Sequence, residues 1–406
     1  MSNCGSEKVE LSIIMPCLNE AETLGICIFK AKKFLELHGI NGEIIVGDNG
    51  SIDGSREIAE KAGARVVPVA QRGYGSAIYY ATLAARGRYV IVGDSDDTYD
   101  FSDLLPFLEK LRAGYNLVMG NRFLGSIKPG AMPWKNRHIG TPVLTAIGRL
   151  FFNCSANDFN CGLRGYSLEA FRRMHLCTTG MEFASEMVIK ATILGMRVTE
   201  VSTTLSPSGR SRPPHLRPWR DGWRHLRFML LYSPRWLFFY PGLFLIFAGS
   251  LLGAWLLPGT RILFGVSLDI QTLLFCAAAV LIGFQAVLFT VLAKIFLVNS
   301  GLLPRNKWFD RIFRFLNLEK GIFCGALLLL AGLAGAGFSV FEWGRMHLGP
   351  LNPVVTMRGV IPSVLLMILG FQIVLSSFFF SILGINIQGL KTWTTTETDS
   401  EEARDS

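Results

Sequence analysis

The sequence contains no Cys-x-x-Cys pair and no other cysteine spacing typical of a metal site, although it has eight cysteines in 406 residues. Structural zinc sites depend on such pairs, so their absence argues against one. We interpret the cysteines as reduced packing residues of a cytosolic compartment. A signal peptide is also not expected, because the N-terminus is polar and leads directly into a predicted strand.

Charged residues are frequent up to Arg235 and scarce after it. The second part holds four apolar stretches, and the first of them, about 22 residues long, would measure about 33 Å as a helix, enough to cross a bilayer. We therefore predict a membrane domain over residues 236–390. The predicted spans are Trp236–Leu257, Gln271–Ala293, Ile322–Phe341 and Val360–Leu383.

Basic residues are unevenly distributed between the predicted membrane loops. The loop over 299–320 carries five, whereas the loops over 258–270 and 342–359 carry one and two. The positive-inside rule then places the N-terminal half, the 299–320 loop and the C-terminal tail in the cytoplasm. The five basic residues are Arg305, Lys307, Arg311, Arg314 and Lys320. The net charge of +9 fits a membrane surface or an anionic substrate.

Strand and helix patterns alternate through the first part of the chain. This alternation predicts an α/β fold with a mainly parallel sheet, and polar clusters follow four of the strands at one sheet edge. Helices are expected near residues 21–37, 73–85 and 101–112. A further helix, between the second and third strands, is expected to run through Ile58. The predicted strands are Leu11–Met15, Glu43–Gly47, Ala64–Val69, Tyr89–Val92 and Asn116–Gly120.

Clustered carboxylates follow the apolar run Tyr89–Val92. Asp94 and Asp96 form an Asp-x-Asp pair at the position where open α/β sheets bind ligands. Such a pair can hold a hard divalent cation, which would neutralise charge on a leaving nucleotide. A solvated acidic turn is the alternative interpretation of an isolated Asp-x-Asp pair.

Four motifs follow one another along the first part of the chain: Pro16-x-x-Asn19-Glu20, Asp48-Asn-Gly-Ser-x-Asp-Gly54, Arg72-Gly-x-Gly75 and Asp94-Ser-Asp96. In this order they resemble the inverting family 2 glycosyltransferases of GT-A fold, and in particular their polyprenyl-phosphate branch, typified by dolichol-phosphate mannose synthases. The resemblance covers roughly 11–227 and implies a metal at Asp94 and Asp96. It also implies a nucleotide-sugar site at Pro16, Asn19, Glu20, Asp48, Asn49, Asp94 and Ser95.

The same resemblance implies residues for the acceptor phosphate and for catalysis. Gly120-Asn-Arg122 looks like a Gly-Ser-Arg element, and Gly209-Arg-Ser-Arg212 looks like a Gly-x-Ser-Lys element. The implied phosphate-binding residues are Arg122, Arg137, Thr141, Arg210, Ser211 and Arg212. The implied catalytic residues are Asp96, Asp158 and Arg122, with a structural cap as the alternative role of Asp158. For Glu182 and Glu186 we favour a structural role.

Two departures from the family pattern concern the donor side. Thr98 stands where relatives often carry Gln, and its neutral hydroxyl is a poorer ligand for the metal. Asn49 stands at the second place of the Asp-Asp-Gly-Ser element, and we interpret it as a subfamily feature that leaves the nucleotide site usable.

Aromatic and basic residues alternate between 216 and 235. Trp219 and Trp223 recur at helical spacing with arginines between them, which predicts an amphipathic helix in the headgroup region. A nucleic-acid patch is the rival interpretation of so many arginines, and the apolar span that follows disfavours it. Residues 1–215 would then form the catalytic domain and residues 391–406 a disordered acidic tail.

The pattern as a whole indicates a multi-pass membrane glycosyltransferase. It would transfer a sugar from a GDP- or UDP-sugar to a polyprenyl phosphate, dolichyl or undecaprenyl, with inversion and with Mg²⁺ or Mn²⁺ as cofactor. The expected partner is the lipid bilayer and not a nucleic acid, and the pattern leaves a homo-oligomer open. The alternatives are a processive polysaccharide synthase, disfavoured by Tyr232 where those enzymes carry Gln, and a non-enzymatic lipid-binding or flippase-like protein.

Overall fold

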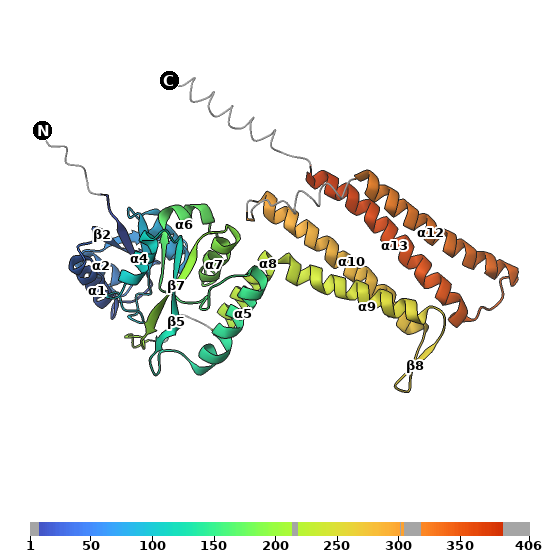
Figure 1. The fold of residues 1–406 in the computed structure, drawn as a ribbon, viewed down its shortest axis with the longest axis horizontal. Helices are drawn as coiled ribbons and strands as arrows, with labels where there is room; N and C mark the ends of the chain where they lie inside the picture. The colour runs from blue at the N-terminus through green and yellow to red at the C-terminus, as the bar shows by residue number, and fades with distance from the viewer. Residues whose placement is uncertain (1–7, 213–217, 301, 304–317, 385–406) are drawn as a thin grey trace, which may run out of the picture. The chain divides into compact units, whose positions relative to one another are not determined.

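Figure 1 shows the computed structural model of the chain, which describes residues 8–212, 218–300, 302–303 and 318–384. The chain divides into two units, Met1–Ser233 and Pro234–Ser406. Four of the five basic residues on which the topology prediction depends, at 305–314, lie outside the described residues, and so does the predicted acidic tail.

The first unit is built on a seven-stranded mixed sheet with the order β3-β2-β1-β4-β6-β5-β7. Among the described strands of this sheet, four neighbouring pairs are parallel, and only β6 runs antiparallel to its neighbours. The predicted α/β fold with a mainly parallel sheet is confirmed. The strands are β1 (Leu11–Cys17), β2 (Gly42–Asp48), β3 (Arg65–Pro68), β4 (Tyr89–Val92), β5 (Leu117–Ile127), β6 (Arg164–Ser167) and β7 (Val198–Leu205).

Helices connect the first five strands in the predicted order, and a helical segment follows β5. Helix α1 forms because apolar residues recur at three- and four-residue intervals, so that one face is buried against the sheet. The helices of this unit are α1 (Leu24–Leu37), α2 (Ser55–Lys61), α3 (Tyr74–Leu83), α4 (Leu105–Arg112), the π-helical turn η1 (Asn136–Gly140), α5 (Thr141–Phe152), α6 (Leu168–Met174), α7 (Phe183–Ile193) and α8 (Pro218–Tyr232).

The order of the strands creates a switch point between β1 and β4. From β1 the chain proceeds outward through β2 and β3, and it then returns to place β4 on the other side of β1. Leu11 of β1 is in register with Gly42 on one side and Tyr89 on the other. Because the loops after β1 and β4 therefore diverge, this edge is the usual ligand position in an open α/β sheet.

One sequence prediction about this edge is wrong. The strand pattern places Gly120-Asn-Arg122 at the end of the fifth strand, but β5 continues to Ile127 and the motif lies inside it. Pairing with β7 extends the strand, through a register shift between Asn121 and Ser126. Strand β6 inserts between β4 and β5, and the sequence pattern does not predict it.

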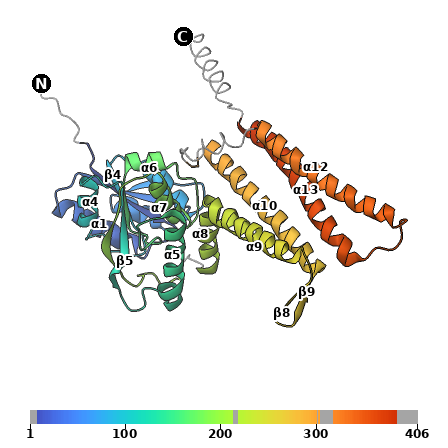
Figure 2. The ribbon, with the colours of Figure 1, turned by 45° about the vertical axis from the view of Figure 1, so that its right-hand side comes forward.

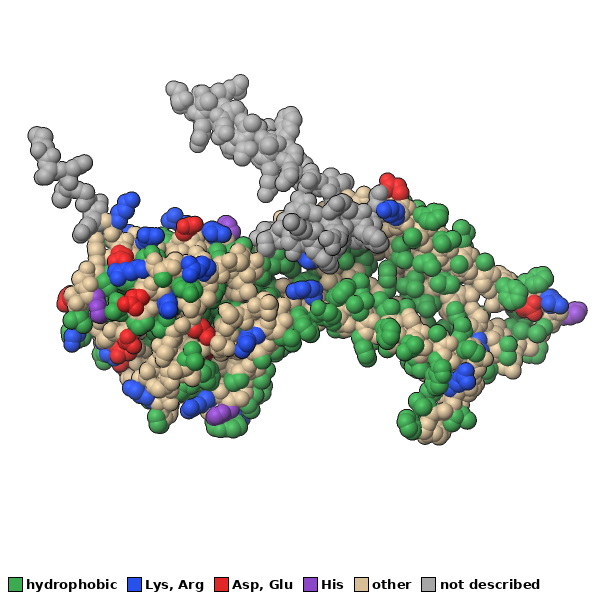
Figure 3. Space-filling view, viewed as in Figure 1, with side chains coloured by type: hydrophobic (Ala, Val, Ile, Leu, Met, Phe, Trp, Pro, Cys, Tyr) green, Lys and Arg blue, Asp and Glu red, His purple; other side chains and the backbone are tan. Residues whose placement is uncertain are grey.

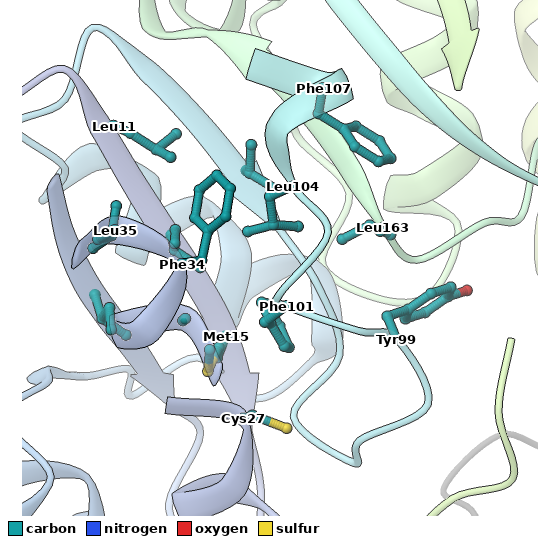
Figure 4. Packing of buried hydrophobic residues seen from close by; sticks show 14 of the residues in the cluster. Leu11, Met15, Cys27, Phe34, Leu35, Tyr99, Phe101, Leu104, Phe107 and Leu163 are labelled. Carbon is teal, nitrogen blue, oxygen red and sulfur yellow. The ribbon is translucent and has the colours of Figure 1, made fainter. Parts of the chain in front are cut away.

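The core of the first unit lies between the sheet and its helices. Figure 4 shows Leu11 of β1, Phe34 of α1 and Leu104 together in this core, and all three are at most 1% exposed. Tyr99 and Leu163 belong to the same cluster, which therefore reaches the edge that carries the site. All the described cysteines are free, five of them buried and two, Cys177 and Cys324, exposed.

The described part of the second unit contains four helices long and apolar enough to cross a membrane, as predicted. Helix α9 packs on α10 and α12 packs on α13. Figure 3 shows hydrophobic side chains predominating on the visible surface of these helices. The elements are η2 (Arg235–Phe239), α9 (Tyr240–Leu256), β8 (Arg261–Leu263), β9 (Val266–Leu268), α10 (Ile270–Asn299), α12 (Leu318–Arg345) and α13 (Pro353–Gly384).

Candidate active site

The loop after β1 is fastened to the loop after β2. Asn19 adopts a left-handed backbone conformation, with φ of 57°. Its side-chain oxygen accepts the backbone N–H of Ile52 at 2.8 Å, and its own N–H donates to Ser51 Oγ at 2.9 Å. The N–H of Glu20 donates to Ser55 Oγ at 2.9 Å. Residues 19–20 are therefore held at the edge by backbone and side-chain groups more than 30 positions away.

Asp48 closes β2 and is fully buried. Its carboxylate accepts backbone N–H groups of Gly50 and Ser51 and pairs with the guanidinium of Arg56. Burial pushes the pKa of Asp48 up, but the hydrogen bonds from Ser51 and Arg56 outweigh burial and hold the pKa below its ordinary value. Asp48 is thus an ionised acceptor that orders the turn after β2.

The side chain of Asn49 uses both the N–H₂ group and the oxygen of its amide. Its Nδ2 donates to the carbonyls of Val69 (3.2 Å) and Gln71 (2.8 Å), and its Oδ1 accepts the N–H of Gly73 at 2.6 Å. A carboxylate could not donate to those two carbonyls. Gly73 itself has φ of 138°, a conformation that favours glycine. The departure from the family pattern therefore fastens the turn that leads into α3.

Asp94, the first member of the Asp-x-Asp pair, is held from two sides. Tyr74 of α3 donates its hydroxyl to Oδ1 at 2.9 Å. On the other side, a Cβ added at Gly162 would lie 2.3 Å from Oδ2, so only glycine allows this approach. Burial and the negative charge of Asp96 raise the pKa of Asp94 to about 6.

Asp96, the second member, has both carboxylate oxygens engaged. Thr98 donates its hydroxyl to Oδ1 at 2.6 Å. The residue that replaces the family's Gln therefore orients this carboxylate. Oδ2 lies 2.9 Å from Nη2 of Arg210. Between the two aspartates, Ser95 donates its hydroxyl to the carbonyl of Pro16 at 2.7 Å and so ties the β4 loop to the β1 loop.

Glu20 joins the β1 loop to the segment after β7. Its Oε1 lies 2.7 Å from Nη1 of Arg210 and 2.6 Å from Nη2 of Arg212. Arg212 also donates to the carbonyl of Leu18 at 2.9 Å, and Ser211 donates its N–H and hydroxyl to Glu22. Burial raises the pKa of Glu20 in spite of the two arginines. We call Glu20, Asp96, Arg210 and Arg212 the donor-edge cluster.

The oxygen set of this edge fits a hard divalent cation. Asp94 and Asp96 supply carboxylate oxygens from one loop, and their mutual repulsion, visible in the raised pKa of Asp94, is what a cation would relieve. Within the part of the chain that the structure describes, no group of three or more His, Cys, Asp or Glu side chains forms a complete metal site. The cation would therefore need further oxygens, such as those of a diphosphate.

Arg122 and Asp158 lie together and form an ion pair with each other. Nε and Nη2 of Arg122 each lie 2.7 Å from a different oxygen of Asp158, and the N–H of Arg122 donates to the same carboxylate at 3.1 Å. Asp158 is fully buried and Arg122 is 8% exposed. Arg122 and Asp158, two of the three predicted catalytic residues, are thus each other's counter-ion.

The two other predicted acceptor residues lie on η1 and α5. Arg137 is exposed on η1, whereas Thr141 is buried at the start of α5. The carboxylates of Glu20 and Asp96 are paired with Arg210 and Arg212 instead of Arg137. The structure therefore assembles Glu20, Asp96, Arg210 and Arg212, and it leaves Arg137 outside that cluster.

Helix α8 is amphipathic in the described part, and Figure 2 shows it beside α5, which it contacts. Trp219 and Trp223 are 88% and 60% exposed. On the buried face, His225 Nδ1 lies 2.7 Å from Ser185 Oγ of α7. Burial lowers the pKa of His225 to about 4, so the ring is neutral at pH 7. Exposed tryptophans agree with an amphipathic helix, whereas its position in the headgroup region stays a prediction.

Glu186 is buried in a polar network of its own. It lies 2.8 Å from Nζ of Lys190 and accepts the N–H and hydroxyl of Thr178 at 2.8 and 2.6 Å. These contacts fix the loop before α7, in agreement with the structural role that the sequence favours.

Sequence reasoning missed Tyr74 and Tyr99. Tyr74 occupies the unspecified place of Arg72-Gly-x-Gly75, and its contact with Asp94 spans 20 residues. Tyr99 accepts the N–H of Gly162 at 2.9 Å and so fixes the segment that approaches Asp94. No spacing rule connects residues so far apart, although a tyrosine within a motif is a signal worth testing.

Comparison with known proteins assigns the class. Residues 12–174 match the glycosyl transferase family 2 model, and residues 291–384 match the model of the glycosyltransferase family 2 C-terminal transmembrane region. The chain is 37% identical over 380 residues to the low-salt glycan biosynthesis hexosyltransferase Agl6 of Haloferax volcanii, an alignment that covers 92% of this chain and 89% of the relative.

Two further similarities are more limited. The dolichyl-phosphate hexose transferase of Haloferax volcanii is 30% identical over 194 residues, which cover 47% of this chain and 81% of the relative. Glucosyl-3-phosphoglycerate synthase from Mycobacterium tuberculosis, solved with Mn²⁺, UDP-glucose and phosphoglyceric acid, gives a TM-score of 0.43 at 21% identity, covering 54% of this chain and 78% of that chain.

The chain belongs to glycosyltransferase family 2. It is a glycosyltransferase with a GT-A catalytic domain and a C-terminal transmembrane region.

Proposed function

We propose that this glycosyltransferase transfers a hexose from a nucleotide-diphosphate sugar to the phosphate of a membrane polyprenyl lipid, with inversion at the anomeric carbon. The name of the Haloferax volcanii relative, a dolichyl-phosphate hexose transferase, supports this acceptor class. The donor would be a GDP- or UDP-sugar.

The observation that carries the proposal is the donor-edge cluster. The guanidinium groups of Arg210 and Arg212 lie 2.6–2.9 Å from carboxylates at the switch point, where the donor diphosphate is expected. A lipid phosphate is an anion that arginine binds through two parallel hydrogen bonds. Arginines from the segment after β7 can therefore hold an acceptor phosphate next to the donor.

The chemistry asks little of a general base. A phosphate monoester is ionised at pH 7, so the attacking oxygen needs placement rather than deprotonation. Asp94 and Asp96 would hold a divalent cation, which supplies charge neutralisation for the leaving nucleoside diphosphate. Arg212 would bind the non-attacking oxygens of the acceptor and keep its attacking oxygen in line with the anomeric carbon.

Arg122 and Asp158 would stabilise the segment that contacts Asp94. Asp158 lies four residues before Gly162, whose backbone approaches Asp94. The buried Arg122–Asp158 pair therefore fixes the segment against which Asp94 rests, in addition to the direct roles that the family resemblance implies for both residues.

The proposed topology places the catalytic unit in the cytoplasm, where nucleotide sugars are made. Ser267 and Ser300 flank α10, one near each end, so they should lie on opposite sides of the membrane. A cysteine at Ser267 should react with an impermeant maleimide on intact cells, whereas one at Ser300 should react only after lysis. The reverse pattern would place the catalytic unit outside.

A donor panel tests the proposed reaction. Membranes containing the full chain are incubated with polyprenyl phosphate and with radiolabelled UDP- and GDP-sugars in turn. We expect one donor to label an organic-extractable lipid that releases its sugar on mild acid. Membranes with Asp96→Asn serve as the matched control. No lipid labelling from any donor would refute the proposed function.

A further inference from the structure

The segment Gly209–Arg212 is anchored on the loop that carries the Asp-x-Asp pair. The N–H of Gly209 donates to the carbonyl of Asp96 at 3.1 Å. One Nη of Arg210 then pairs with Glu20 and the other with Asp96. The side chains of Arg210, Asp96 and Glu20 are only 12%, 11% and 6% exposed. A single guanidinium therefore bridges the β1 loop and the β4 loop.

We propose that Arg210 is a positioning residue that competes with the divalent cation for Asp96, so that donor binding displaces Arg210 and turns it toward the acceptor phosphate. The competition concerns Asp96 alone, whereas the turn toward the acceptor rests on the proposed function. Such an exchange predicts a binding order in which the metal and the nucleotide precede the lipid phosphate.

Charge makes the two occupants of Asp96 mutually exclusive. Nη2 of Arg210 lies 2.9 Å from Oδ2, and the other oxygen already accepts the hydroxyl of Thr98. A hard cation binds a carboxylate oxygen at about 2.0–2.6 Å, within a few ångströms of that guanidinium. Two positive charges at this distance and at this degree of burial repel each other strongly.

The hydrogen bonding of Arg210 is also incomplete, unlike that of Arg122. Nε of Arg210 and Oε2 of Glu20 are buried atoms without a hydrogen-bond partner among the described residues. Buried polar atoms in a purely structural ion pair are normally satisfied, and neither Arg122 nor Asp158 has a buried side-chain atom without a partner. The unused donor and acceptor are consistent with a contact that is exchanged for another during the reaction.

Arg212 keeps the segment attached when Arg210 leaves Asp96. It pairs with Glu20 and donates to the carbonyl of Leu18, and both of these partners belong to the β1 loop. Glu20 would therefore stay neutralised after the exchange. The freed edge of the Arg210 guanidinium would face the oxygens of an incoming phosphate. Metal binding and acceptor binding are then coupled through one side chain.

The first experiment measures Mn²⁺ binding to the full-length protein in detergent by electron paramagnetic resonance of the free ion. Arg210→Ala removes the competitor and should tighten Mn²⁺ binding about tenfold, the size of effect that a neighbouring charge has on a carboxylate. Arg210→Gln, which keeps the size and the polarity of the side chain, should do the same and covers the case in which the alanine variant does not fold.

Arg212→Ala is the matched control, because it removes an equal charge that is paired with Glu20 on the β1 loop. We expect its Mn²⁺ affinity to rise about threefold or less, because Arg212 is paired with Glu20, whereas Arg210 is paired with Asp96 itself. Unchanged or weaker Mn²⁺ binding by both Arg210 variants would overturn the competition. An equal gain in Arg212→Ala would also overturn it, because the effect would then be general electrostatics.

The second experiment measures binding of a short-chain polyprenyl phosphate with and without Mn²⁺ and UDP or GDP. The parent should bind the lipid at least about fivefold more tightly when metal and nucleotide are present, and Arg210→Ala should lose this dependence. If the parent shows no dependence, the proposed coupling is wrong. If the lipid phosphate does not bind under any condition while Mn²⁺ competition holds, the proposed acceptor fails and the role of Arg210 at Asp96 stands.

Discussion

Two arginine–carboxylate groups in the catalytic unit use the same side-chain chemistry in different ways. Arg122 and Asp158 form a closed pair, with two bonds of 2.7 Å. The donor-edge cluster is by contrast an open cluster, because Arg210 divides its guanidinium between two carboxylates and leaves Nε without a partner among the described residues. Complete pairing indicates a structural role, whereas shared and incomplete pairing indicates a group that can exchange partners with a ligand.

The closed pair should show its largest effect on stability. Arg122→Ala leaves the Asp158 carboxylate buried without its counter-ion, which costs about 3–5 kcal/mol of unfolding free energy. Denaturant unfolding of the catalytic unit within the full chain, followed by tryptophan fluorescence, measures this loss. Arg212→Ala, the matched control from the open cluster, should change the unfolding free energy by less than about 1 kcal/mol. Equal destabilisation by both variants would abolish the distinction.

The open cluster should show its largest effect on turnover. Asp96→Asn keeps the size of the side chain but removes a charge that would hold the cation, and we expect kcat to fall about 10²–10³-fold. EDTA should reduce the parent's activity similarly. The melting temperature should stay within a few degrees of the parent, because Thr98 can still donate to the amide oxygen. Undiminished activity of the variant in EDTA would contradict the metal assignment.

The acceptor side of the same cluster should respond more moderately. Arg212→Ala should lower acceptor-limited kcat/KM about 10–100-fold, since a charge-assisted contact contributes about 1.5–3 kcal/mol. Arg212→Lys should restore part of this loss, because one charge survives. The assay uses detergent and a short soluble polyprenyl phosphate, which removes anionic headgroups. Parent-like kinetics there would make Arg212 a membrane anchor instead of an acceptor ligand.

Glu186 and Lys190 form another buried ion pair, at a site for which no ligand is proposed. Burial pushes the pKa of Glu186 up, but Lys190 and Thr178 outweigh burial and hold the pKa below its ordinary value. Stability from this group is therefore present above the unfolded pKa and is lost as the pH falls through the lower folded pKa.

Glu186→Gln should reduce the unfolding free energy at pH 7 by about 1–2 kcal/mol and flatten its decrease at acid pH. Denaturant unfolding of the parent and the variant from neutral to acid pH measures both effects. A variant that loses stability on acidification as steeply as the parent would show that other carboxylates carry this dependence. Activity at pH 7 should change less than in any variant of the open cluster.

Local patterns are sufficient to predict much of the fold and part of the site. Strands β1, β2 and β4 are short apolar runs followed by polar loops, so the amino-acid sequence alone places Glu20, Asp48 and Asp96 at one edge. The four helices of membrane-spanning length follow from the length and hydrophobicity of their segments. Both signals depend only on neighbouring residues.

Pairings between distant residues could not be predicted. Arg210 meets Glu20 across 190 positions and Arg122 meets Asp158 across 36. The family resemblance implies ligands for these residues, a prediction that contains no information on which carboxylate each arginine contacts. Strand β6 was missed for a related reason, since its four residues, Arg164–Ser167, lack an alternating pattern and are fixed by pairing with β4 and β5.

The most direct test of the account is whether the acceptor must carry a phosphate. Purified full-length protein, Mn²⁺ and the active donor are combined with a short polyprenyl phosphate or with the corresponding polyprenol. We predict that nucleoside diphosphate release and sugar-lipid formation occur in equal amounts with the phosphate, and that mass spectrometry finds the sugar on the phosphate. Equal transfer to the polyprenol, or diphosphate release without a lipid product, would contradict the account.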